Sequence, residues 1–117
     1  MREIIFYETE GGQCPVEKFI DSLSAKQAQK VTWVLSLIEE LTMTPANYFK
    51  KLTNTNGIWE VRVSQGGNIF RLLGFFDGAN LIVLNHAFQK KSQKTPSQAI
   101  KTAEERKMDY LKRKEKK

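Results

Sequence analysis

The clearest pattern along the chain is an alternation of apolar and polar residues near its middle. From residue 59 to residue 64 every second side chain is apolar and its neighbours are polar. Because successive side chains of a strand point to opposite faces of a sheet, this period of two predicts a strand with one polar face. Glycine-containing turns then separate it from two further predicted strands, at residues 69–76 and 81–88. The last of these is apolar on both parities, which predicts a central position in a sheet.

A helical period precedes these strands. Ser24 and Gln27 have the spacing of a capping box, and apolar residues follow at every third or fourth position. We therefore expect a helix at about residues 24–41. Pro15 suits the first turn of a shorter helix that extends to about residue 22. A loop that contains Lys50 and Lys51 joins the helical region to the strands.

The two ends of the chain complete the predicted fold. Residues 3–8 are rich in β-branched and aromatic side chains and predict a first strand. A third helix is expected near the C-terminus, with Thr95 as its N-cap and Pro96 as its first residue. Its basic end, residues 112–117, is expected to fray. The order strand, two helices, three strands and helix predicts one α+β domain whose helices gather against one face of an antiparallel sheet.

Composition changes this picture mainly through charge. The chain has 117 residues, a length that fits one domain with a single core, and a formal net charge of +6. Residues 1–49 hold a balance of −3, whereas residues 50–117 hold a balance of +9. A concentrated positive field attracts nucleic acid, an anionic membrane surface or an acidic protein. A solvated lysine-rich tail is the alternative explanation.

Several classes of function are disfavoured by what the sequence lacks. It has no apolar run of about 18 residues for a membrane span, and its first residues lack the long apolar stretch and cleavage site typical of a secretory leader. Cys14 is the single cysteine, so no internal disulfide forms, and one His with one Cys cannot build a common zinc site. Nothing suggests a glycine-rich phosphate loop, a Ser-His-Asp triad or an acidic two-metal cluster. We therefore expect a cytoplasmic protein that uses no metal and no cofactor.

The remaining candidates for chemistry are cations in or just beyond the predicted strands. They are Lys50, Lys51, Arg62, Arg71, Lys90, Lys91 and Lys94. Arg62 shares its parity with Glu60, so it is expected on the sheet face opposite Trp59. Arg71 lies in a strand that is apolar on both sides, where an unpaired guanidinium is costly. It is therefore expected either to pair with a carboxylate such as Glu60 or to face a functional cleft.

The segment 86–96 leaves the last predicted strand and brings lysines to a helix N-terminus. The helix dipole at that end favours anions, so a bound phosphate would explain these cations, and solvated loop lysines are the alternative. His86 has the parity of Ile82 and Leu84, which favours a core histidine over a catalytic one and leaves its role open. Phe88 either stacks on a base or, more commonly for an aromatic residue, packs in the core.

A site built from cations can cleave RNA, because the ribose 2′-hydroxyl of the substrate is itself a nucleophile. The protein then has to orient this hydroxyl, remove its proton, stabilise charge on phosphorus and assist the leaving oxygen. The guanidinium groups of Arg62 and Arg71 suit charge stabilisation, since they bind phosphate oxygens bidentately. A lysine can transfer a proton at neutral pH only if its pKa falls below about 10.4. Neighbouring cations would lower it.

Three motifs in the second half of the chain carry a resemblance to a known family. They are GIWEVRV at 57–63, which follows Leu52, NIFRLLGFF at 68–76 and HAFQKKSQKTP at 86–96. In order and spacing they resemble the RelE and HigB group of toxins from bacterial type II toxin-antitoxin pairs, in a branch first described from phage genes. With the helical segments around them, the motifs span nearly the whole chain.

The resemblance implies a RelE/ParE-like α+β fold with a twisted antiparallel sheet, two N-terminal helices and one C-terminal helix. It also implies a metal-independent endoribonuclease, an mRNA interferase that cuts messenger RNA in the A site of the ribosome. Its implied protein partner is a cognate helix-turn-helix antitoxin, through which alone it would reach operator DNA.

The resemblance also assigns roles by position. Arg62 and Arg71 match basic sheet residues that contact the scissile phosphate, and Lys90, Lys91 and Lys94 match the basic segment after the last strand. These five are the candidate catalytic residues, and the candidate RNA-binding residues are Lys50, Lys51, His86 and Phe88. Some relatives use a tyrosine near the C-terminus, for which Tyr110 is only a loose counterpart. The general base is therefore left open.

Two other functions are compatible with these features. A ParE-type inhibitor of DNA gyrase would share the implied fold without needing arginines that face a phosphate. A non-catalytic RNA-binding or regulatory module would use the basic surface without turnover, and its binding would depend steeply on salt.

Overall fold

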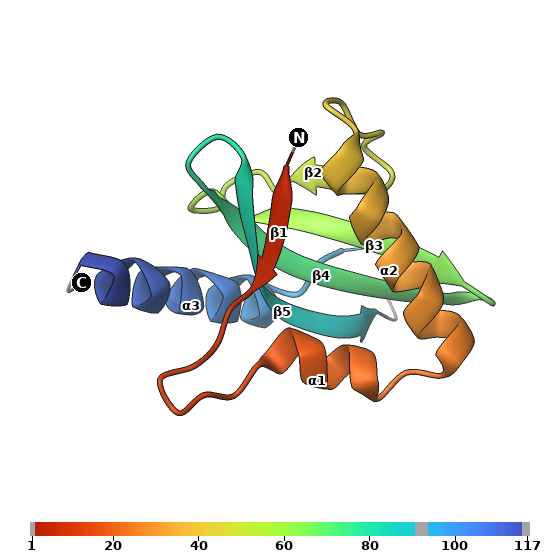
Figure 1. Ribbon diagram of the computed structural model, residues 1–117, viewed down its shortest axis with the longest axis horizontal. Coiled ribbons are helices and arrows are strands. Elements are labelled where there is room, and N and C mark those ends of the chain that lie inside the picture. Colours follow the sequence, from red (N-terminus) through yellow and green to blue (C-terminus); the bar gives the residue numbers. More distant parts are fainter. Residues whose placement is uncertain (1, 91–93, 116–117) are drawn as a thin grey trace.

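The fold is a five-stranded mixed sheet with three helices. A computed structural model describes residues 2–90 and 94–115. Its elements are β1 (Glu3–Phe6), α1 (Pro15–Asp21), α2 (Ala25–Glu40), β2 (Phe49–Lys51), β3 (Trp59–Gln65), β4 (Asn68–Asp77), β5 (Leu81–Lys90) and α3 (Ser97–Glu115). The strand order is β1-β5-β4-β3-β2 (Figure 1). β5 thus has a neighbour on each side, which confirms its predicted central position.

Two features of the sheet differ from the prediction. β2 is a strand that was not predicted, because it has only three residues and follows an irregular loop. β1 pairs in parallel with β5, whereas the other neighbours are antiparallel, so the sheet is mixed. A hairpin forces antiparallel pairing. β1 is followed by two helices instead of a hairpin, and the pattern of side chains did not reveal where it would pair.

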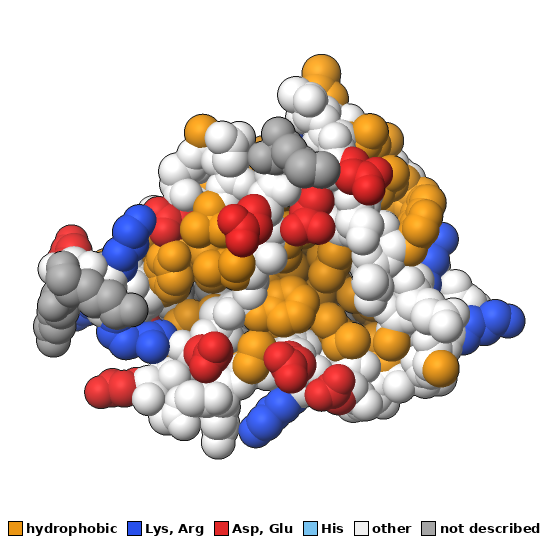
Figure 2. Space-filling model, in the orientation of Figure 1, with side chains coloured by type: hydrophobic (Ala, Val, Ile, Leu, Met, Phe, Trp, Pro, Cys, Tyr) orange, Lys and Arg blue, Asp and Glu red, His pale blue; other side chains and the backbone are white. Residues whose placement is uncertain are grey.

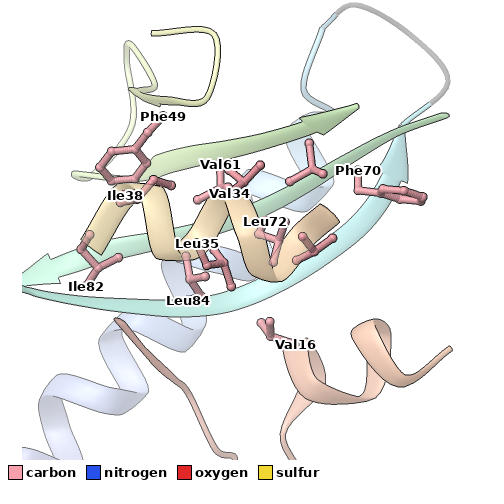
Figure 3. Packing of buried hydrophobic residues seen from close by; sticks show 12 residues of the cluster. Val16, Val34, Leu35, Ile38, Phe49, Val61, Phe70, Leu72, Ile82 and Leu84 are labelled. Atoms are coloured by element: carbon pink, nitrogen blue, oxygen red, sulfur yellow. The ribbon is translucent and has the colours of Figure 1, made fainter. Parts of the chain in front are cut away.

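Helices cover both faces of the sheet, which corrects the prediction that they gather on one. On one face α1 and α2 pack over the main core. Figure 3 shows Val34, Leu35 and Ile38 of α2 packed next to Val61, Leu72 and Leu84 of the strands. On the other face Ala99 and Ala103 of α3 pack against Ile58 and Leu73. Since β4 and β5 are apolar on both parities, each of their faces has to be covered.

The starts of the two long helices differ in how they are capped. At α2 the Ser24 hydroxyl accepts from the Gln27 amide at 3.2 Å, and the Gln27 side chain accepts from the Ser24 amide at 3.0 Å. The predicted capping box is confirmed. At α3 the Ile100 amide donates to the carbonyl of Pro96 at 3.2 Å, so Pro96 occupies the cap position. The predicted N-cap at Thr95 is wrong by one residue, because Pro96 holds that position, and the Thr95 hydroxyl donates to Glu60.

The C-terminal end of α3 is held against the sheet. The Tyr7 hydroxyl donates to Asp109 at 2.6 Å, and the Tyr110 hydroxyl donates to Asp77 at 2.8 Å. The Lys114 ammonium also donates to Asp77, at 2.8 Å. Residues 112–115 belong to α3, and residues 116–117 lie outside the described part of the chain, so the fraying expected for residues 112–117 stays a prediction. None of the described helices has the length and apolar character that a bilayer crossing requires.

A close approach of two strands makes Gly74 necessary. A β-bulge interrupts the β4–β5 pairing between Leu73 and Gly74. A Cβ atom at Gly74 would lie 2.1 Å from the carbonyl oxygen of Val83 and 2.9 Å from the Cα of Leu84. Both are backbone atoms of the sheet, so they cannot move aside without breaking the pairing.

We expect Gly74→Ala to lower the free energy of unfolding by about 3 kcal/mol, since the added methyl group overpacks the sheet. Gly11→Ala is the matched control, because its Cβ would meet nothing nearer than the Thr9 hydroxyl at 3.9 Å. It should change stability by no more than about 0.5 kcal/mol. Urea unfolding midpoints measure both. Equal midpoints for the two variants would contradict the packing at Gly74.

The contact between Tyr110 and Asp77 should give stability a pH dependence. Burial, and then the hydrogen bond to Asp77, raises the pKa of Tyr110 to about 12. A raised pKa in the folded state means that the contribution is complete below pH 10 and is lost as the pH rises toward about 12. Tyr110→Phe should lower the free energy of unfolding by about 1 kcal/mol at neutral pH. Unfolding is measured at neutral pH and at about pH 12, and the stability difference between Tyr110→Phe and the unchanged protein should be smaller at the higher pH. Tyr48→Phe is the control.

Candidate nucleic-acid interface

The candidate arginines lie on the sheet face that carries α3. Residues that stand directly opposite in an antiparallel pair share a face. Arg62 of β3 stands opposite Arg71 of β4, and Arg71 stands opposite Phe88 of β5. Val61, the neighbour of Arg62, packs in the core on the other face. The predicted orientation of Arg62 is therefore confirmed.

Arg71 is not a surface residue. Its guanidinium forms an ion pair with Glu60, and the two side chains are 2% and 1% exposed. The second carboxylate oxygen of Glu60 accepts from the Thr95 hydroxyl. Of the two alternatives open for Arg71, the structure shows the pairing with Glu60. Two like charges directly opposite each other, Arg62 and Arg71, are unfavourable in a sheet, and the Glu60 carboxylate offsets this repulsion.

Lys90 completes this arrangement from the end of β5. Its side chain is 6% exposed, and its ammonium lies 3.5 Å from the Thr95 hydroxyl. Burial lowers the pKa of Lys90, and the positive charges of Arg71, Arg62 and Lys50 lower it further against the opposing effect of Glu60. The positive charges of the other three cations therefore act on Lys90. We call Lys50, Arg62, Arg71 and Lys90 the cation cluster.

The two lysines of β2 point to opposite faces of the sheet. Lys50 stands opposite Glu60, on the face of the cation cluster, whereas Lys51 stands opposite Trp59, on the face of α2. Both side chains are exposed. The sequence grouped them as candidate RNA-binding residues, because β2 was not recognised as a strand. The structure brings only Lys50 to the cluster.

Of the two candidate lysines that follow β5, the structure describes one. Lys94 is exposed and directly precedes Thr95, which contacts Glu60. Lys91 lies outside the described residues.

His86 and Phe88 face α3 and not the main core. Opposite Leu73 and Arg71, they share the face of the cation cluster, and their rings lie 5.4 Å apart. The predicted common parity of His86 with Ile82 and Leu84 is wrong, because the β-bulge adds one residue to β5. Phe88 packs against the cluster of apolar residues under α3. The half-buried His86 has a pKa below its ordinary value, owing to burial and then to the charge of Arg106.

Arg106 of α3 was not singled out in the sequence. Its guanidinium donates to the Asn85 carbonyl at 2.7 Å and lies 3.4 Å from Nδ1 of His86. The Asn85 side chain in turn donates to the carbonyl of Ala103 at 2.9 Å. Arg106 thus adds a cation beside His86 on the same face. The helical period of residues 99, 103 and 106 placed Arg106 on the inner side of α3, and this signal was available in the sequence.

Tyr110 lies away from the cation cluster. Its ring packs edge-on to Phe75, and its hydroxyl donates to Asp77 at the far end of β4 from Asn68. Arg71 and Asp77 are about 20 Å apart along the strand, at about 3.3 Å per residue. Tyr110 borders a separate hollow of about 550 Å³, in which Arg113 is paired with Asp109 and Lys114 with Asp77. This geometry gives no support to a catalytic role for Tyr110.

The arrangement favours the binding of a polyanion. The four clustered cations come from four neighbouring strands, and the carboxylate that pairs with Arg71 is buried. A phosphate oxygen would reduce the repulsion among these cations. Among residues 2–90 and 94–115, no group of three His, Cys, Asp or Glu side chains is placed to hold a metal ion.

Comparison of the sequence with models of known protein families identifies the family of this chain. The family model described as Phage derived protein Gp49-like (DUF891) matches residues 18–108, which include the cation cluster. The chain belongs to the Gp49-like family. This family is associated with toxin-antitoxin systems, and membership suggests an antitoxin as partner of this Gp49-like protein. No match was found among curated proteins.

We expect Arg71→Ala to lower the free energy of unfolding of the Gp49-like protein by about 3–5 kcal/mol, because it leaves the buried Glu60 carboxylate without its guanidinium. Arg62→Ala should cost about 1 kcal/mol or less, since Arg62 is half-buried and stands opposite a like charge. Chemical unfolding of the purified variants provides the comparison. If Arg71→Ala were as stable as Arg62→Ala, the ion pair would not be structural.

Proposed function

We propose that the chain is the toxin of a type II toxin-antitoxin pair and that it cleaves messenger RNA on the ribosome, using the ribose 2′-hydroxyl as the nucleophile. The observation that carries the proposal is the convergence of Lys50, Arg62 and Lys90 around the buried Glu60–Arg71 pair. The family association with toxin-antitoxin systems supports the toxin assignment. The same proposal includes a RelE/ParE-like fold, an endoribonuclease activity and a helix-turn-helix antitoxin.

The geometry divides the work among the cations. Arg62 and Lys50 are the accessible members of the cluster and are proposed to bind the phosphate oxygens at the cleaved bond. Arg71 is buried against Glu60, so its proposed role is to fix the position of that carboxylate and to add to the positive potential of the site without contacting the RNA. This differs from the direct phosphate contact that the resemblance implied. Lys94 is exposed beside Thr95 and is proposed to bind the RNA at a phosphate away from the cleaved bond.

Lys90 is the proposed proton-transfer group. Burial and the surrounding cations lower its pKa, so a larger fraction of its amine is neutral near pH 7 than for an ordinary lysine. In that form, with its amine turned from the Thr95 hydroxyl toward the substrate, it is proposed to accept the proton of the 2′-hydroxyl, and the resulting ammonium is proposed to donate a proton to the leaving oxygen. His86 has a lowered pKa and lies next to Phe88, so this pair is proposed to contact the base or the sugar.

The two lysines of β2 provide a matched test of this proposal. Lys50→Ala should lower the rate of mRNA cleavage about tenfold, because it removes a cation from the cluster. Lys51→Ala, an identical change one residue away, should leave the rate unchanged within about twofold, since Lys51 points to the other face. Arg62→Ala should lower the rate about 100-fold. The measurement is the mapping of cleaved mRNA ends in a translating extract supplied with purified protein.

The outcomes separate the proposal from its alternatives. Equal effects of Lys50→Ala and Lys51→Ala would contradict the placement of the site. RNA binding that depends steeply on salt, with no cleaved ends, would identify a non-catalytic module. A gyrase inhibitor would leave mRNA intact, block DNA supercoiling and tolerate Arg62→Ala. Arg71 is unsuitable for this comparison, because its substitution is expected to destabilise the fold.

A further inference from the structure

A second surface lies on the side of the sheet that carries α1 and α2. It is a hollow of about 350 Å³ between β1, α1 and α2. Its floor is apolar and is formed by Ile4 and Phe6 of β1, Ile20 of α1 and Leu35 of α2. Ile4, Phe6 and Ile20 are half-buried and pack against the main core. The floor is therefore an extension of the core that reaches the surface, and covering it would be favourable.

The rim of this hollow is acidic. Glu17 of α1 and Glu39 of α2 border it. An adjoining hollow of about 360 Å³ shares Glu17 and adds Glu8 and Asp21 together with one cation, Lys18. Figure 2 shows this face of the molecule, with apolar side chains gathered in its centre and acidic side chains above and below them. The occupant that complements such a surface has apolar anchors flanked by Lys or Arg.

The edge of β1 indicates the form of that occupant. β1 is an edge strand, and an extended peptide can add to an open edge. However, the outward amide of Arg2 donates to the Glu39 carbonyl at 3.0 Å, and that of Ile4 donates to the Glu39 carboxylate at 3.0 Å. The end of α2 thus already occupies this part of the edge. Docking through the side chains of a helix requires no such displacement.

We propose that this surface, the acidic groove, binds a basic amphipathic helix of a protein partner. Apolar side chains of the helix would cover Phe6, Ile20 and Leu35, while its Lys or Arg side chains would face Glu17 and Glu39. The acidic groove and the cation cluster lie on opposite faces of the sheet, so a helix bound in the groove leaves the cluster uncovered. The proposal therefore does not depend on RNA cleavage.

The test uses two designed helical peptides of about 15 residues. They share one apolar face, and one carries Lys and Arg on its flanks where the other carries Glu. Each is titrated into the full-length, isotope-labelled protein, and amide shifts are followed by NMR. The basic peptide should shift amides of β1, α1 and α2 and bind at least about tenfold more tightly than the acidic one. Added salt should weaken its binding.

Two charge reversals provide the control for non-specific attraction. Glu17→Lys should weaken the basic peptide about tenfold and strengthen the acidic one; it should leave the protein folded, with at most a slightly lower unfolding midpoint, because Glu17 is exposed but lies in the first turn of α1. Glu105→Lys makes the same change of charge at an exposed position on α3, and should alter binding by no more than about twofold. Equal binding of the two peptides, shifts centred on α3, or equal effects of the two reversals would overturn the proposal. Both variants should retain mRNA cleavage, so a failure of the groove is distinguishable from a failure of the nuclease.

Discussion

The buried ion pair between Glu60 and Arg71 is the interaction on which the face of the cation cluster depends. Glu60 accepts from Arg71 of β4 through one oxygen and from Thr95, just before α3, through the other. The same carboxylate thereby connects β3, β4 and the start of the C-terminal helix. It also offsets the repulsion between Arg71 and Arg62, which stand directly opposite each other. Without it, the concentration of cations on this face would work against the folded state.

The pair is costly by itself, because two charges lose their hydration when they are buried. Its surroundings explain why it can be kept. Both oxygens of Glu60 accept hydrogen bonds, one from Arg71 and one from the Thr95 hydroxyl. The Lys90 ammonium lies close to the same hydroxyl. The consequence for Lys90 is a lowered pKa, since its ammonium is buried among Arg71, Arg62 and Lys50. The structural pair and the lowered pKa of the nearby amine are thus parts of one electrostatic arrangement.

The two faces of the sheet have opposite character, and this separation follows from the layout of the chain. The acidic N-terminal half supplies β1, α1 and α2 and therefore the acidic groove. The basic second half supplies the central strands, whose polar parity carries Glu60 and Arg62 away from the main core. One small domain consequently offers one surface suited to a polyanion and another suited to a basic protein segment.

Apart from the short strand β2, the sequence by itself determined the local elements, and it also determined the face of Arg62, because helical and strand periods and capping residues act over a few neighbours. It also restricted the partner of Arg71, since a buried guanidinium needs a carboxylate. The β-bulge that turns His86 toward α3, the separation of Lys50 from Lys51, and the parallel pairing of β1 were decided only by the tertiary structure. Each depends on register between segments distant in the chain. A shift of one residue moves every side chain of a strand to the other face, and no local pattern records that shift.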